Sequence, residues 1–165
     1  MDHSIAETEK SIRRWLIFFI VGLILSGLTA FPLESELGWL CNNWADKNSA
    51  LYHWIKKCHL AIRDTNSKYP FLAYGYDWLA FAHIVIATAF IGPLNDPIRN
   101  IWIIQWGRIA CVMVIPLAFI AGEIRGIPIG WRLIDCSFGV AGIIPLTICY
   151  NKITLLEVLK SVVTT

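Results

Sequence analysis

Residues 130–150 read GWRLIDCSFGVAGIIPLTICY, and this stretch decides the class of the protein. A membrane-spanning helix needs about 20 mainly apolar residues, and the stretch meets that length. Its only charged residues are Arg132 and Asp135, near its start. Charged groups inside a bilayer are costly, so each of them needs a partner or a function there. The stretch therefore predicts a transmembrane helix with a polar feature near one end.

Three further stretches have the same length and apolar character, at residues 15–33, 76–95 and 100–122. Of the 165 residues, 56% are hydrophobic and 16% are charged, whereas a soluble domain carries about 25% charge. Inside lipid every backbone group must be satisfied within its own helix. We therefore predict an all-α integral membrane protein, a single transmembrane domain over residues 1–165 with four helices in one bundle.

The first apolar stretch has an alternative interpretation as a cleaved signal peptide. Its run is longer than the usual apolar region of about 7–15 residues, and Leu28-Thr29-Ala30 is a poor cleavage site. We therefore interpret residues 15–33 as a membrane anchor. Ser4 and Glu7 match a capping box, which predicts that this helix begins at Ser4.

Positive charges predict the orientation. Lys10, Arg13 and Arg14 precede the first span, which favours a cytoplasmic N-terminus in a bacterial inner (plasma) membrane. The cations expected on the same side are Arg99, Lys152 and Lys160. The loop over residues 34–70 then lies outside, although it also carries five cations, namely Lys47, Lys56, Lys57, Arg63 and Lys68.

Two amphipathic helices are expected outside the spans. In the outer loop, residues 49–64 have helical apolar spacing, which predicts a helix lying on the membrane or capping the bundle. The C-terminal tail, residues 152–165, repeats the pattern, with Thr154 and Glu157 as a capping box. This tail would lie along the inner leaflet or dock on a partner.

Ionisable groups within the spans are the candidate ligand-binding residues. At about 1.5 Å of rise per residue, Asp135, His83 and Arg108 fall at successive depths. If their helix faces converge, these residues form a polar pocket open to the outside. The remaining candidates lie at its mouth or beside Arg108, and they are Asp77, Glu123, Arg125, Arg132 and Gln105.

Each candidate also has a structural interpretation. Arg132 and Asp135 are three residues apart on one helix and can pair with each other. Arg108 can extend its charge to the head groups, and His83 can hydrogen-bond to another helix. Asp77 can cap the start of its helix.

The cysteines divide into two groups. Cys41 and Cys58 fall in the outer loop and can form a disulfide if that side is oxidising. Thiols within spans most often serve as small packing residues, and these are Cys111, Cys136 and Cys149. The absence of a C-x-x-C pair counts against the four-helix quinone reductases that generate disulfides.

Two function classes remain open. The first is a non-catalytic accessory subunit or a binder of a lipid-like or small anionic ligand, with the lipid bilayer and a membrane-protein partner or second copy as partners. The second is a small membrane enzyme or redox protein that uses His83 with Asp135 or Asp77. In that case His83 and His59 are the candidate ligands of a metal or haem. No phosphate-binding loop, H-E-x-x-H motif or dinucleotide fingerprint is present, and no long basic run suggests nucleic acid.

Overall fold

A computed structural model describes residues 2–164, and it describes side-chain surroundings for residues 3–162. The described part of the chain is 88% helical and contains no strand. Four segments are long and apolar enough to cross a membrane, namely His3–Ala30, Pro70–Asn95, Ile101–Ile124 and Ile129–Val162. The expected all-α class, with four segments long and apolar enough to cross a membrane, is therefore confirmed.

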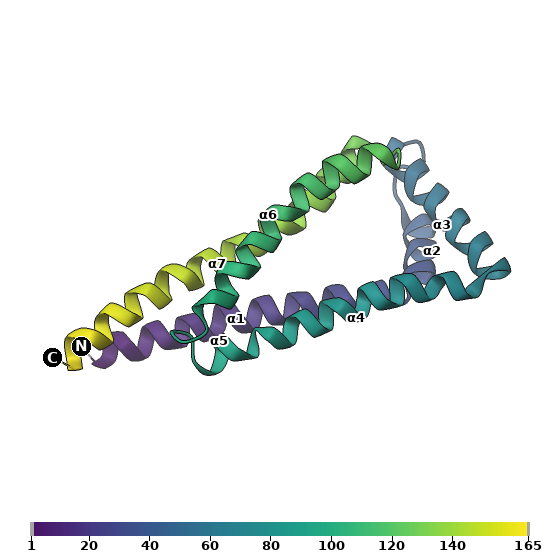
Figure 1. Cartoon of the computed structure of the whole chain (residues 1–165). Coiled ribbons are helices and arrows are strands. Elements are labelled where there is room, and N and C mark those ends of the chain that lie inside the picture. Colours follow the sequence, from purple (N-terminus) through teal and green to yellow (C-terminus); the bar gives the residue numbers. More distant parts are fainter. Residues whose placement is uncertain (1, 165) are drawn as a thin grey trace. The chain divides into compact units, whose positions relative to one another are not determined.

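The helices follow one another along the chain with short connections (Figure 1). Between the first and second crossing segments lie two helices, where the sequence predicted one. In order, the elements are α1 (Asp2–Ala30), α2 (Leu33–Asn43), α3 (Ala50–Lys68), the 3-10 helix η1 (Pro70–Ala73), α4 (Tyr74–Ala89), α5 (Ile91–Asn95), α6 (Ile101–Ile124) and α7 (Ile129–Thr164).

The chain divides into two compact units, and each is described by itself. Unit 1 contains the chain up to Gly22 together with everything from Ile86 onward, and unit 2 is Leu23–Val85. Helices α1 and α4 each contribute to both units. The single bundle expected over the whole chain stays a prediction.

The start of α1 differs from the expectation. The helix already includes Asp2, and the hydroxyl of Thr8 donates to the carbonyl of Ser4 at 2.8 Å. Ser4 is thus a residue within the helix, and the predicted capping box is wrong. At its other end α1 stops at Ala30, before Pro32, because proline has no N–H for the helical ladder and clashes with the preceding turn.

Helix α7 also differs from the expectation, because a separate span and tail were predicted where one continuous helix exists. The hydroxyl of Thr154 donates to the carbonyl of Tyr150 at 3.1 Å, so Thr154 is not a cap. No glycine or proline follows Pro145, so nothing in the local sequence ends the helix between the predicted span and the predicted tail. Ile153 and Leu156, which were expected on a membrane-surface helix, are fully buried in the unit 1 core.

Small residues let the helices of unit 1 approach closely. Helices α6 and α7 lie side by side as an antiparallel pair (Figure 1). A Cβ at Gly107 would lie 2.8 Å from Phe90 Cζ and 2.9 Å from Leu146 Cδ1. A Cβ at Gly139 would lie 2.5 Å from the carbonyl oxygen of Cys111. Gly107 and Cys111 of α6 thus lie at points where small side chains permit close helix packing.

Unit 2 contains the helix that was predicted over residues 49–64, here α3. Ser49 caps it by accepting a hydrogen bond from the Tyr52 backbone N–H at 3.2 Å. Near the other end of α3, the Asn66 amide donates to Glu34 at 2.8 Å and to the Tyr76 hydroxyl at 3.1 Å. These bonds tie α3 to α2 and α4. The expected position of α3 on a membrane surface stays a prediction.

Candidate functional site

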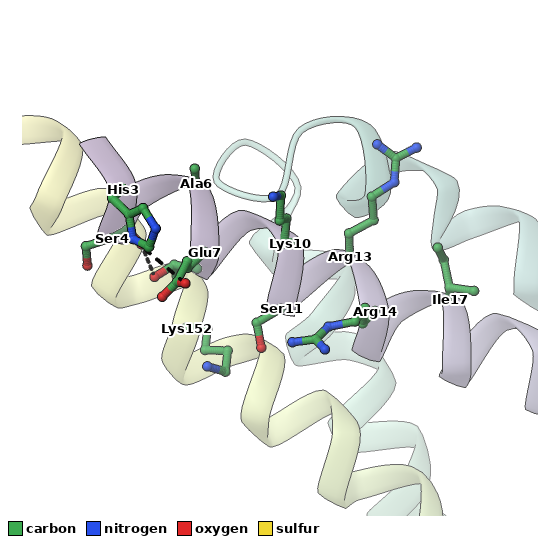
Figure 2. A pocket seen from close by; sticks show the side chains of 11 residues that line it. His3, Ser4, Ala6, Glu7, Lys10, Ser11, Arg13, Arg14, Ile17 and Lys152 are labelled. Carbon is green, nitrogen blue, oxygen red and sulfur yellow. Dashed lines mark hydrogen bonds and ion pairs between the residues drawn. The ribbon is translucent and has the colours of Figure 1, made fainter. Parts of the chain in front are cut away.

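A basic cleft lies at the start of α1 in unit 1. Its volume is about 770 Å³, within the range of about 300–1,000 Å³ that is typical of ligand pockets. Most of its wall comes from the first turns of α1, and α7 contributes one residue. The lining residues are His3, Ser4, Ala6, Glu7, Thr8, Lys10, Ser11, Arg13, Arg14, Ile17 and Lys152 (Figure 2).

Apolar packing holds the start of α1 against the second half of α7. Ile12 and Leu16 of α1 are buried, as are the α7 residues on the facing side. The Cys149 thiol donates to the carbonyl of Ile12 at 3.8 Å. At the end of the contact, Lys160 Nζ and Glu9 Oε1 form an ion pair at 2.7 Å. The cleft therefore lies along a packed contact between two helices, which gives it a defined wall.

Four cations line the basic cleft, namely Lys10, Arg13, Arg14 and Lys152. Within the described residues, none of the four forms an ion pair within 4.0 Å. The one carboxylate of the lining, Glu7, lies 3.8 Å from the ring of His3. In Figure 2, Arg14 extends toward α7 while Arg13 points to the other side of α1. The cleft therefore carries an excess of positive charge.

A second hollow of about 510 Å³ adjoins the same end of unit 1. It shares Ala6, Lys10 and Arg13 with the basic cleft. Its other lining residues are Glu9, Ile12 and Leu16 of α1, residues 93–97 at the end of α5 and just beyond it, and Lys160 of α7. The start of α1, the end of α7 and the α5–α6 connection thus lie together. The sequence predicted one membrane side for these three segments, and their common end agrees with that. Which side it is stays a prediction.

The opposite end of unit 1, at the α6–α7 turn, neutralises its arginine internally. Arg132 Nη1 donates to Glu123 Oε2 at 2.5 Å, and Nε donates to the carbonyl of Ile127 at 2.6 Å. Gly122 leaves room for this side chain, because a Cβ there would lie 2.9 Å from Arg132 Cδ. Gly126 has a φ of +64°, which allows the Schellman-type turn that brings Ile127 back to the helix end.

The contacts of the residues predicted at the outer mouth differ from those expected. Arg132 contacts Glu123, so the expected alternative of an Arg132–Asp135 pair is wrong. Asp135 is half-buried, and its side chain makes no hydrogen bond or ion pair with the described residues. Arg125 is exposed at the C-cap of α6. Of the four mouth residues in unit 1, the structure brings together only Glu123 and Arg132.

Arg108 and Asp135 do not meet. The Arg108 guanidinium lies over the ring of Tyr150, 4.8 Å from its centroid. Asp135 precedes Tyr150 by fifteen residues, which is roughly 22 Å along α7. Gln105 and Arg108 line one small cleft of about 350 Å³ between α6 and α7. Arg108 thus packs on an aromatic ring, and the expected extension toward the head groups is not the conformation adopted.

The remaining candidates lie in unit 2. His83 Nδ1 lies 2.8 Å from the carbonyl of Leu79, so it bonds within its own helix, and no bond to another helix is described for it. Asp77 lies in the first turn of α4, where a carboxylate interacts favourably with the helix dipole. The ring of His59 packs at Gly38, where a Cβ would lie 3.2 Å from Nε2. Across the described residues, no group of three or more His, Cys, Asp or Glu side chains is arranged to hold a metal ion.

The two loop cysteines are free thiols in this structure. Cys41 is buried on α2 and Cys58 is half-buried on α3. Burial raises the pKa of the Cys58 thiol, and the charge of Lys57 partly offsets that rise. A raised pKa lowers the thiolate fraction and slows oxidation. The disulfide between these residues stays a prediction for oxidising conditions.

The sequence did not predict the basic cleft, although three of its four cations were already noted. Lys10, Arg13 and Arg14 served there only to predict orientation. Their spacing of three and four residues puts neighbours on one helix surface, which is a signal for a local cationic face. The contribution of Lys152 has no sequence signal, because it depends on how α7 packs against α1.

Comparison of the chain with protein-family models, with curated proteins and with solved structures finds no match.

Proposed function

We propose that this small polytopic membrane protein binds an anionic phospholipid head group in the basic cleft, without catalysing a reaction. The observation that carries the proposal is the set of four cations around one cleft, contributed by two helices and lacking acidic partners among the described residues. A cluster of this kind attracts phosphate, and each Lys or Arg near an anionic membrane surface contributes about 1 kcal/mol of binding.

The position of the cleft along the chain supports a lipid rather than a freely diffusing anion. Ile17 lines its inner edge, and from there α1 continues as an uncharged apolar helix to Ala30. A phosphate in the cleft would thus lie where head groups meet the apolar core. The hydroxyls of Ser4 and Ser11 line the same wall and can donate hydrogen bonds to phosphate oxygens.

The sequence predicts such a ligand at the outer mouth. There Arg132 already has a carboxylate partner, which reduces its attraction for an external anion. The basic cleft has no such compensation, so we move the proposed site to it. With a cytoplasmic N-terminus, the cleft would face the leaflet whose negative surface potential favours basic segments.

The enzyme or redox alternative has less support. The His83 ring is bonded to its own helix, and Asp77 lies in a position that a helix dipole explains. The expected membrane-protein partner or second copy is independent of lipid binding. Measuring the mass of the detergent-purified protein by light scattering checks it.

The test compares head groups at constant acyl chains. The full chain in mild detergent is titrated with phosphatidylglycerol or phosphatidylcholine, and native mass spectrometry measures the bound fraction. We expect the anionic lipid to bind more tightly. Replacing two cleft cations in Arg14→Gln/Lys152→Gln should weaken that binding by roughly 30-fold, from about 1 kcal/mol for each cation.

Two controls make the test specific. The variant Lys56→Gln/Lys57→Gln removes the same charge from exposed positions on α3 and should bind the lipid like the wild type. Glycerol phosphate, which lacks acyl chains, should bind far more weakly than the lipid. Equal binding of the two lipids, or equal weakening in both double variants, would overturn the proposal.

A further inference from the structure

The small cleft lined by Gln105 and Arg108 differs from the basic cleft in its mainly apolar wall. It has a volume of about 350 Å³ and lies between α6 and α7. Apolar side chains form most of its wall, and two polar residues of α6 join them. Its lining residues are Gln105, Arg108, Ile109, Val112, Met113 and Ile143.

Arg108 is incompletely satisfied in this cleft. Its guanidinium stacks on Tyr150, which uses the face of the group and leaves the N–H edges for hydrogen bonds. The Nε atom is buried and has no hydrogen-bond partner, and Arg108 forms no ion pair with the described residues. A buried donor without a partner costs about 1–3 kcal/mol. The described residues therefore leave this cleft-lining arginine without an acceptor for Nε and without a counter-charge.

The depth of Arg108 restricts the ligand. The residue lies seven positions beyond Ile101, the start of α6, which corresponds to roughly 10 Å along the helix. An anion that reaches this depth must arrive with an apolar chain attached, because a free anion would lose its hydration without compensation. Gln105 lies one turn nearer the helix start and is exposed, so its amide can also donate to the anion.

The size of the cleft and the geometry of arginine select among anionic amphiphiles. A volume of about 350 Å³ is near the lower end of the range for ligand pockets. It suits a small planar anion and the first carbons of one chain better than a branched phosphodiester with two chains. A planar guanidinium binds a carboxylate through two parallel hydrogen bonds.

From these observations we infer that the α6–α7 cleft binds the carboxylate of a single-chain amphiphile, such as a long-chain fatty acid, through Arg108 and Gln105. The site shares no residue with the basic cleft. It goes beyond the proposed function, and either site can fail in experiment without the other.

The test uses palmitate labelled with ¹³C at its carboxyl carbon and the full chain in nanodiscs of phosphatidylcholine. The carboxyl signal in NMR measures binding, and methyl palmitate is the uncharged competitor of the same chain length. We expect palmitate to bind with a shifted carboxyl signal and methyl palmitate to leave it unchanged. Arg108→Gln should weaken binding at least tenfold, and Arg108→Lys should be intermediate because an ammonium cannot bind in the bidentate manner.

Further variants keep the inference falsifiable if Arg108→Gln does not fold. Ile109→Trp keeps the arginine and narrows the cleft from its exposed wall, so it should also abolish the signal shift. Arg99→Gln removes an exposed cation outside the cleft and should bind palmitate like the wild type. Displacement of palmitate by methyl palmitate, or unchanged binding in Arg108→Gln and Ile109→Trp, would overturn the inference. Capture of an acidic transmembrane partner at Arg108, with no palmitate binding, would overturn it as well.

Discussion

The two charged ends of unit 1 differ in whether their cations have acidic partners. At the α6–α7 turn, Arg132 is largely buried, with 11% of its side chain exposed, and it is bonded to Glu123 and to a backbone carbonyl. At the other end, Arg14 and Lys152 line the basic cleft without an acidic partner among the described residues. The first arginine is bonded within the turn, whereas the second set of cations has no acidic partner among the described residues and forms the proposed anion site.

The difference arises from where the acidic residues lie. Glu123 comes from the last turn of α6, nine residues before Arg132 in sequence, so the short turn brings the two together. At the basic end, Glu9 pairs with Lys160, and Glu7 of the cleft lining lies 3.8 Å from the ring of His3. Within the described residues, neither carboxylate forms an ion pair with a cation of the basic cleft. This excess of cations without ion-pair partners is the observation on which the proposed anion site rests.

The largest expected effect is a loss of stability when the packing between α6 and α7 is disrupted. Gly139→Leu places a Cβ at a position 2.5 Å from a backbone oxygen, which cannot move aside as a flexible side chain would. Overpacking of this kind costs about 1–3 kcal/mol or more. We expect a clearly lowered melting temperature in detergent. Gly130→Ala is the control, since nothing lies within 4 Å of a Cβ at that position, and its stability should change by less than about 0.5 kcal/mol.

A second prediction tests whether the two ends differ in stability. Arg132→Gln removes the ion pair and leaves the Ile127 carbonyl without its donor, so we expect a loss of about 1–2 kcal/mol. Glu123 has 75% of its side chain exposed, which keeps the estimate low because solvent screens the pair. Arg14→Gln should change the free energy of unfolding by less than about 0.5 kcal/mol. Thermal unfolding of both variants without added lipid measures the two losses in stability. A larger loss of stability in Arg14→Gln than in Arg132→Gln would contradict the prediction.

Ionic strength offers a third way to separate the ends. The Debye length falls from about 30 Å at 0.01 M to about 3 Å at 1 M. Binding of phosphatidylglycerol to the exposed cations should therefore weaken several-fold over this range. The difference in melting temperature between wild type and Arg132→Gln should change little, because the Arg132 side chain is mostly shielded. Lipid binding that is insensitive to salt would contradict a cationic site.

The smallest effect is expected at the exposed ion pair beside the cleft. Lys160 and Glu9 have side-chain exposures of 46% and 45%, and such pairs contribute about 0–1 kcal/mol. Lys160→Gln frees a carboxylate near the cleft and should weaken phosphatidylglycerol binding by about twofold or less. Glu9→Gln should strengthen binding slightly. Native mass spectrometry of the two variants measures the difference, and shifts of the same sign would show that Glu9 does not repel the ligand.

Prediction from sequence succeeded where one helix is enough to decide the outcome. The four apolar segments and the helix after Ser49 follow from length and periodicity, which act within a single segment. Helix ends were less predictable. Ser4 and Thr154 both resemble caps in sequence, yet each lies inside a longer helix, because no residue nearby forces the chain to leave the helical conformation.

The candidate site shows the same division. His83, Asp135 and Arg108 were identified because charge inside an apolar segment is visible in one sequence. Their expected convergence depended on helix rotation and register, which local periodicity does not specify. The structure separates Arg108 from Asp135 along α7 and stacks Arg108 on Tyr150.

By itself, the sequence determined that this is a helical protein with four segments long and apolar enough to cross a membrane, because burying apolar side chains and pairing backbone groups are requirements of each segment alone. Only the tertiary structure decided which charges are neutralised. Arg132 has a partner because the turn at Gly126 returns Glu123 to it. Lys152 joins Arg14 because α7 continues along α1. Electrostatic pairing depends on distances between segments, and only the packed fold sets those distances.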